Sequence, residues 1–133
     1  MGVRILKLKT FARFVRREHI NVAVLGDAFD RAEDGLVDAD LGGGLIKQRA
    51  ARPGQGKRRG YRTFIAFRSK LRAVFLFGYA KNELDNIDKD QLATLREVAA
   101  LWLAADAQKI AHAIKDGLLI EVKNGNDKKE KDG

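Results

Sequence analysis

The fold of this chain is decided by residues 45–80, which read LIKQRAARPGQGKRRGYRTFIAFRSKLRAVFLFGYA. Three runs within this stretch, 45–51, 61–68 and 72–80, have the spacing and residue types of β-strands. Only three residues join the second run to the third, so we predict that these two strands are antiparallel neighbours. Residues 52–60 contain the only proline and predict a longer basic loop. The stretch therefore predicts a three-stranded meander.

A strand and two helices are predicted before the meander. Residues 3–8 alternate apolar and basic side chains, which is typical of a short edge strand whose charges discourage further pairing. Thr10 is a candidate N-cap for a first helix, because apolar residues follow it at helical spacing. Asn21 is a candidate N-cap for a second helix, which ends near Gly35.

The residues after the meander predict two further helices and a last strand. Asp88 is a candidate N-cap for a long amphipathic helix, residues 108–115 predict a short helix, and residues 118–122 predict a last strand. Residues 124–133 contain no apolar side chain and predict a disordered tail, which leaves 1–123 as a single domain. The expected fold class is α+β: a small antiparallel β-sheet with two N-terminal helices and a C-terminal helix packed on it.

The basic charge is concentrated in one part of the chain. Residues 42–82 contain eleven Lys or Arg and no Asp or Glu, whereas the rest of the chain carries 15 basic and 18 acidic side chains. A segment of this kind indicates a polyphosphate partner such as a nucleic acid. An ordinary basic surface, or a docking patch for an acidic protein, is the alternative explanation.

Several classes of function are disfavoured by composition. The chain has no cysteine, so disulfides, thiolate catalysis and cysteine-ligated zinc are excluded. The two histidines, His19 and His112, are isolated, and we expect no metal or other cofactor. The longest apolar run, 98–105, is too short to span a membrane, and no signal peptide is apparent, so we expect a cytoplasmic protein.

A phosphate-binding loop for nucleotides is also disfavoured. Gly54, Gly56 and Lys57 have part of the required pattern. The pattern fails at Ala51, where it needs glycine, and at Arg58, where it needs serine or threonine. We therefore do not expect nucleoside triphosphate binding.

Residues 45–67, followed by FGYAKNEL at 77–84, resemble the RelE/ParE superfamily of bacterial toxins and, within it, the HigB-like branch. The resemblance is strong over residues 41–103. It implies a small antiparallel sheet with packed helices, cleavage of messenger RNA on the ribosome, and inhibition of translation. It also implies a cognate antitoxin as partner, often a helix-turn-helix DNA-binding protein.

The resemblance implies four catalytic residues, which are Lys47, Arg49, Arg62 and Lys81. Attack by a 2′-hydroxyl on the neighbouring phosphate needs a base, cations for the developing charge, and an acid for the leaving oxygen. Lys47 and Arg49 are two residues apart on a strand and so share a face. Crowding by like charges lowers a lysine pKa, and guanidinium groups clamp phosphates. No metal is needed for such a reaction.

Other residues are candidates for binding. The RNA- or ribosome-binding candidates are Arg52, Lys57, Arg58, Arg59, Tyr61 and Tyr79. For the four basic residues the alternative is a solvated loop, and for the two tyrosines it is a structural role. Glu83 is a candidate proton acceptor or an ion-pair partner. Asn82 and Asp88 depart from the RelE pattern, which has arginine and a catalytic tyrosine there.

Two other functions fit the same fold. One is a non-enzymatic inhibitor of DNA gyrase, like the ParE branch, although the retained cation cluster disfavours it. The other is a catalytically silent module that binds RNA or the ribosome. The expected protein partner is an antitoxin whose acidic residues face residues 42–82 or whose helix packs on the sheet, because burying those cations without partners would be costly.

Overall fold

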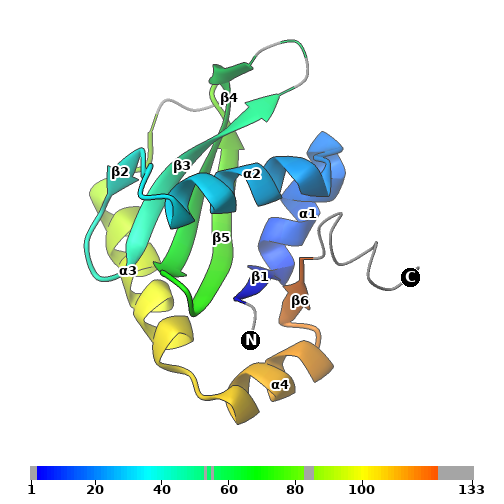
Figure 1. Ribbon diagram of the computed structural model, residues 1–133, viewed down its shortest axis with the longest axis vertical. Helices are drawn as coiled ribbons and strands as arrows, with labels where there is room; N and C mark the ends of the chain where they lie inside the picture. Colours follow the sequence, from blue (N-terminus) through cyan, green and yellow to red (C-terminus); the bar gives the residue numbers. More distant parts are fainter. Residues whose placement is uncertain (1–2, 53, 55, 83–85, 123–133) are drawn as a thin grey trace.

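The computed structural model describes residues 3–52, 54, 56–82 and 86–122, and it has the expected α+β fold (Figure 1). The elements in chain order are β1 (Arg4–Leu8), α1 (Lys9–Glu18), α2 (Val22–Glu33), β2 (Ala39–Asp40), β3 (Leu45–Arg52), β4 (Gly56–Arg68), β5 (Arg72–Ala80), α3 (Lys89–Ala104), α4 (Ala107–Lys115) and β6 (Leu119–Glu121). The tail expected at 124–133 lies outside the described residues. None of the helices described is long and apolar enough to span a bilayer.

The predicted meander is confirmed by β3, β4 and β5, which are antiparallel neighbours in the middle of the sheet. The sheet order is β2-β3-β4-β5-β1-β6, and every pair except β5 with β1 is antiparallel. The prediction of a long loop at 52–60 is wrong, because Arg52 already pairs with Gly56, the first residue of β4. A turn needs few residues once glycine supplies a positive φ, as Gly54 does with φ 77°.

The edge position expected for the first strand is also wrong. β1 lies between β5, to which it runs parallel, and β6, which returns from the far end of the chain. Leu6 is consequently fully buried. Local alternation of side chains could not reveal this position, because both partners of β1 are distant in sequence.

Helices cover both faces of the sheet. α1 and α2 pack on the face that carries Ile46, Tyr61 and Ile65, and these lie in one apolar core (Figure 1). α3 packs on the opposite face, which carries Leu45 and Phe64, and α4 contributes to the same second core. The alternation of side chains along each strand thus divides the sheet between two cores.

The structure confirms two of the three predicted helix N-caps. Asn21 and Asp88 are confirmed, since their side chains accept hydrogen bonds from the backbone N–H groups of Ala23 (2.9 Å) and Gln91 (2.8 Å). Thr10 is not a cap, because β1 runs directly into α1 and the helix begins at Lys9. The Lys9 N–H donates instead to the carbonyl of Leu118 (3.0 Å). A backbone group from the C-terminal part thus replaces the expected side-chain cap.

A fully buried amide, Gln48, joins α2 to the sheet. Its Nε2 donates to the carbonyls of Ala28 (3.0 Å) and Leu36 (3.3 Å), and its Oε1 accepts from the N–H of Asp38 (2.7 Å). These bonds link α2, the segment that follows it and β3. Because Gln48 lies between Lys47 and Arg49, the same bonds fix the backbone from which those two cations project.

We predict that Gln48→Leu lowers the free energy of unfolding by about 2–4 kcal/mol, because it leaves several buried backbone groups without a partner. Urea denaturation measures this change. Thr63→Val is the matched control, because Thr63 loses only its hydrogen bond to the Gln48 carbonyl (3.0 Å), a change of about 1 kcal/mol. Equal losses for the two variants would contradict a bridging role for the amide.

Candidate nucleic-acid interface and cation cluster

Strand register brings the basic residues of the meander to one face of the sheet. Arg49 lies directly opposite Arg62, and Lys47 lies opposite Phe64. These side chains share the face that carries the α3 core, since Leu45 and Phe64 belong to that core. Lys81 directly follows β5, whose Tyr79 pairs with Arg62. The four residues therefore meet on the α3 face of the sheet.

Lys47 is the centre of this cation cluster, which consists of Lys47, Arg49, Arg62 and Lys81. Its Nζ lies 5.9 Å from the centroid of the Phe64 ring and 3.5 Å from Oδ1 of Asn86. Burial lowers the pKa of Lys47, and the positive charges of Arg62, Lys81 and Arg49 lower it further. The neutral amine is therefore more accessible at Lys47 than in an ordinary lysine.

The two arginines of the cluster differ in exposure. Arg62 is only 8% exposed, and its Nη1 donates to the carbonyl of Tyr61 (3.4 Å). Arg49 has an exposed side chain on a constrained backbone, because its N–H donates to Oδ2 of Asp38 (2.7 Å) and its carbonyl accepts from Arg31. A buried and an exposed guanidinium thus stand on adjacent strands, an arrangement suited to holding a phosphate between them.

A small basic pocket adjoins the cluster at the ends of β3 and β4. It has a volume of about 240 Å³ and is lined by Arg52, Arg59, Lys81 and Asn82. Arg52 is held there, since its Nη1 donates to Oδ1 of Asn82 (3.0 Å) and its Nη2 lies 3.9 Å from a carboxylate oxygen of Glu18. Lys81 is common to the pocket and the cluster, since it lines the pocket and its charge lowers the Lys47 pKa.

The two candidate tyrosines are buried, which favours the structural alternative for both. Tyr61 is 2% exposed and lies on the other face, where its ring meets Phe14 edge-on at 5.6 Å. Burial and the nearby Glu18 raise the Tyr61 pKa. Tyr79 is 5% exposed and lies 6.1 Å from Phe64 and 6.2 Å from Phe77. Neither ring presents an open face to an RNA base.

Some expected residues cannot be placed in the site, and others have a structural role. The side chains of Lys57 and Arg58, and all of Glu83, lie outside the described part of the chain. Asp88, which occupies the approximate position of a catalytic tyrosine in the RelE pattern, forms a capping box with Gln91. Asn86 was missed by sequence reasoning, because an asparagine just before a helix cap has no distinguishing pattern.

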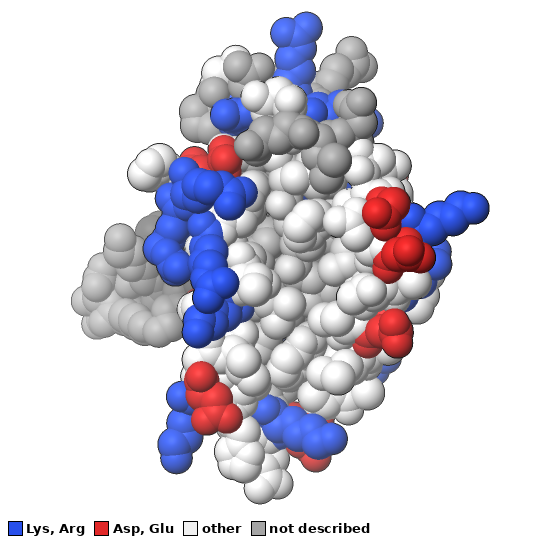
Figure 2. Space-filling view, turned by 180° about the vertical axis from the view of Figure 1, so that it is seen from behind, with Lys and Arg blue, Asp and Glu red and all other residues white. Residues whose placement is uncertain are grey.

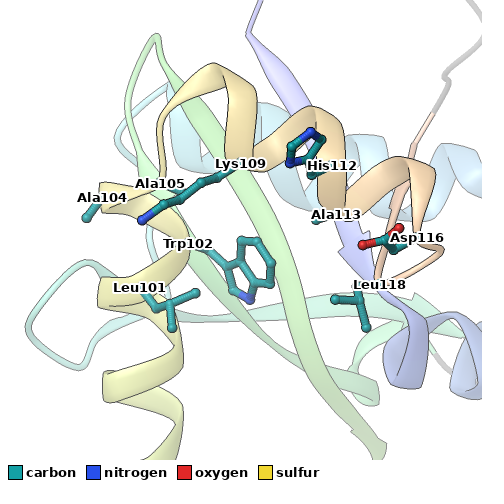
Figure 3. Close-up of a pocket in the computed structure, with 9 residues that line it drawn as sticks. All are labelled: Leu101, Trp102, Ala104, Ala105, Lys109, His112, Ala113, Asp116 and Leu118. Carbon is teal, nitrogen blue, oxygen red and sulfur yellow. The ribbon is translucent and has the colours of Figure 1, made fainter.

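The described residues offer neither a histidine pair nor a group of side chains suited to holding a metal ion. His19 and His112 are exposed, and no group of three or more metal-ligating side chains occurs among the described residues. A cavity of about 510 Å³ lies between α3 and α4 and is lined largely by apolar side chains, including Leu101, Trp102 and Leu118 (Figure 3). Its polar side chains are Lys109, His112 and Asp116, which do not form a cluster of like charge.

We predict that the Lys47 amine titrates below the usual lysine pKa, and that Lys81→Ala moves this pKa back toward the usual value by removing a neighbouring positive charge. NMR titration of the lysine side-chain resonances measures both shifts. Lys109→Ala on the exposed side of α4 is the control and is expected to leave the Lys47 pKa unchanged. A Lys47 pKa at the usual value would contradict the clustering.

Comparison with known proteins supplies the family. The family model described as the RelE toxin of the RelE/RelB toxin-antitoxin system matches residues 3–122, which span β1 to β6 and include the whole cation cluster. No match is found among curated proteins. The family model covers nearly the whole chain, and the fold is consistent with it. This protein therefore belongs to the RelE toxin family.

Proposed function

We propose that the protein is a ribosome-dependent messenger RNA endoribonuclease, the toxin of a type II toxin-antitoxin pair, in the HigB-like branch of its superfamily. RelE toxins generally inhibit translation by cleaving messenger RNA. The observation that carries the proposal for this chain is the half-buried Lys47 beside Arg49, Arg62 and Lys81. Burial lowers its pKa, and the three charges lower it further. The basic segment and the HigB-like motif at residues 77–84 support it.

The proposed reaction is cleavage by the neighbouring 2′-hydroxyl. Neutral Lys47 takes the proton of that hydroxyl, and the oxygen attacks the phosphorus. Arg62 and Arg49 stabilise the additional negative charge on the phosphorane. Lys81 donates a proton to the leaving 5′-oxygen as the P–O bond breaks. The products are a 2′,3′-cyclic phosphate and a 5′-hydroxyl, and no metal ion takes part.

The protein partner is a cognate antitoxin, which membership of the family implies. We propose that acidic residues of a helix-turn-helix antitoxin face the basic segment, because covering those cations without partners would be costly. The toxin and its ribosomal target would then meet in the cytoplasm. Arg52 and Arg59 are proposed to contact ribosomal RNA phosphates, since they line the basic pocket beside the cluster.

Brief induction of the protein is expected to produce new 5′ ends on a translated message and none on the same message without its start codon. Arg62→Ala should lower the cleavage rate at least about 100-fold, because it removes a buried charge from the transition state. Mapping of 5′ ends by primer extension measures the cuts.

The matched control for the cleavage experiment is Arg68→Ala. Arg68 lies on the same strand as Arg62, but it is exposed and is the last residue of the strand, where it pairs with Arg72 away from the cluster, so cleavage should be unchanged. Growth arrest without new 5′ ends would overturn the nuclease proposal. Blocked supercoiling in that case would favour the gyrase inhibitor, and ribosome binding without cuts would favour the silent module.

Lys47→Arg is expected to abolish cleavage while preserving ribosome binding, because arginine keeps the charge but cannot act as a base near neutral pH. In the wild-type protein, the single-turnover rate should rise with pH as Lys47 loses its proton, and level off above its lowered pKa. In Lys81→Asn, the rise in rate should occur at higher pH, because the loss of a neighbouring positive charge raises the Lys47 pKa. A rate independent of pH below the usual lysine pKa would rule out Lys47 as the base.

A further inference from the structure

A second basic surface runs along α1, and it lies outside the basic segment 42–82. Lys9, Arg13, Arg16 and Arg17 are exposed. Arg13 follows Lys9 by four residues, and Arg16 and Arg17 follow Arg13 by three and four, so the side chains form one strip along the helix. Figure 2 shows a band of basic side chains over α1 along one edge of the sheet face that also carries the cation cluster. Burial and the nearby charge of Arg16 lower the pKa of Lys7, at the base of this strip.

Acidic side chains do not neutralise the strip within the part of the chain that the structure describes. Arg17 lies 3.8 Å from Glu18, but Lys9, Arg13 and Arg16 form no ion pair with any described carboxylate. Like charges at helical spacing destabilise a helix. An external anion would remove this repulsion.

Phe77 lies between this strip and α3. β1 pairs with β5 only as far as Phe75, and beyond that point α1 lies beside β5. A shallow pocket of about 160 Å³ is formed there by residues that include Phe14, Arg17 and Phe77. A second pocket, of about 300 Å³, is formed by Phe77 with residues of α3 that include Asp90. The half-buried Phe77 ring is therefore flanked by space on both sides.

The Phe77 ring connects the strip to the cation cluster. Phe77 pairs with Phe64 across β4 and β5, and their ring centroids are 5.9 Å apart. The Phe64 ring in turn lies beneath the Lys47 amine at 5.9 Å. On the other side, Phe77 and Arg17 line the same shallow pocket. Cations and aromatic rings thus lie between Lys47 and α1, with Phe64 buried beneath the surface and Phe77 half-buried.

We infer that this surface is a track for single-stranded RNA, in which the α1 strip binds phosphates and Phe77 stacks on a base. Grooves that bind single strands combine these two features, because charge follows the backbone and every base has a face that can stack. The inference rests on the proposed function, since it extends the bound strand beyond the cleaved phosphate. Asp90, at the far side of Phe77, disfavours an acidic peptide there but can accept a hydrogen bond from a base amino group.

The test measures binding of a fluorescent single-stranded RNA of about ten nucleotides, within the roughly 4–16 that such grooves cover, across a potassium chloride series. The RNA carries 2′-O-methyl groups, which prevent cleavage by the neighbouring hydroxyl. Arg13→Glu/Arg16→Glu is expected to weaken binding about 10- to 100-fold at low salt. The slope of log affinity against log salt should fall by about 1.4, because two phosphate contacts are lost.

The charge-matched control is Lys109→Glu/Lys115→Glu on α4. These lysines are exposed, and α4 lies at the opposite end of the molecule from the end of β3 and the start of β4 (Figure 1). The control changes the net charge by the same amount, so it reports the effect of overall charge alone. It should weaken binding by no more than about 3-fold.

Phe77→Leu tests stacking independently of charge. It should weaken binding about 10-fold without changing the salt slope, because no phosphate contact is lost. An RNA of the same length with abasic positions should bind wild type and Phe77→Leu equally. A merely structural role for Phe77 would weaken binding of both RNAs.

Three outcomes discriminate among the explanations. Equal affinities for the α1 variant and the α4 control would overturn the track, whatever the cleavage assay shows. Wild-type RNA binding with lost binding of polyglutamate would assign the strip to an acidic protein. Losses of RNA affinity as expected, together with no cleavage of translated messages, would sustain the track and overturn the nuclease proposal, because this assay needs neither a ribosome nor a cleavable strand.

Discussion

The antiparallel pairing of β3 with β4 is the constraint on which the site depends, because it sets Arg49 directly opposite Arg62. Like charges opposite each other oppose pairing, at a cost of roughly 0.2–1 kcal/mol for such a pair. Apolar pairs further along the same strands offset this cost, such as Ile46 with Ile65 and Leu45 with Ala66. The sheet thus concentrates its apolar pairs at one end of these strands and its positive charge at the other.

Register is fixed from both faces of β3. A slip of one residue would turn Lys47 and Arg49 toward the α2 core and place Gln48 among the cations. The three hydrogen bonds of Gln48 to α2 and the segment after it oppose such a slip, because they are made only when its amide faces that helix. A buried polar side chain on one face therefore positions the charged side chains on the other.

Sequence alone was sufficient for features whose causes are local. The meander, the caps at Asn21 and Asp88 and the grouping of Lys47 with Arg49 all follow from turns, capping chemistry and strand alternation. Features that depend on distant partners were missed: the central position of β1 and the approach of Asn86 to Lys47. The spacing of apolar side chains within one segment does not show which distant segment will pack against it. The resemblance to a toxin family supplied candidate site residues that spacing alone could not.

The crowding that, together with burial, lowers the Lys47 pKa also affects ligand binding. A cluster whose members repel one another gains more from an arriving anion than an isolated lysine would, because each new negative charge interacts with several cations. A ligand that binds only the folded state raises stability by an amount that grows with its concentration above the dissociation constant. If RNA phosphates and an acidic antitoxin segment both use these cations, each must exclude the other, and the bound antitoxin must also stabilise the fold. Inhibition and stabilisation would then have one physical origin, the relief of repulsion between β3 and β4.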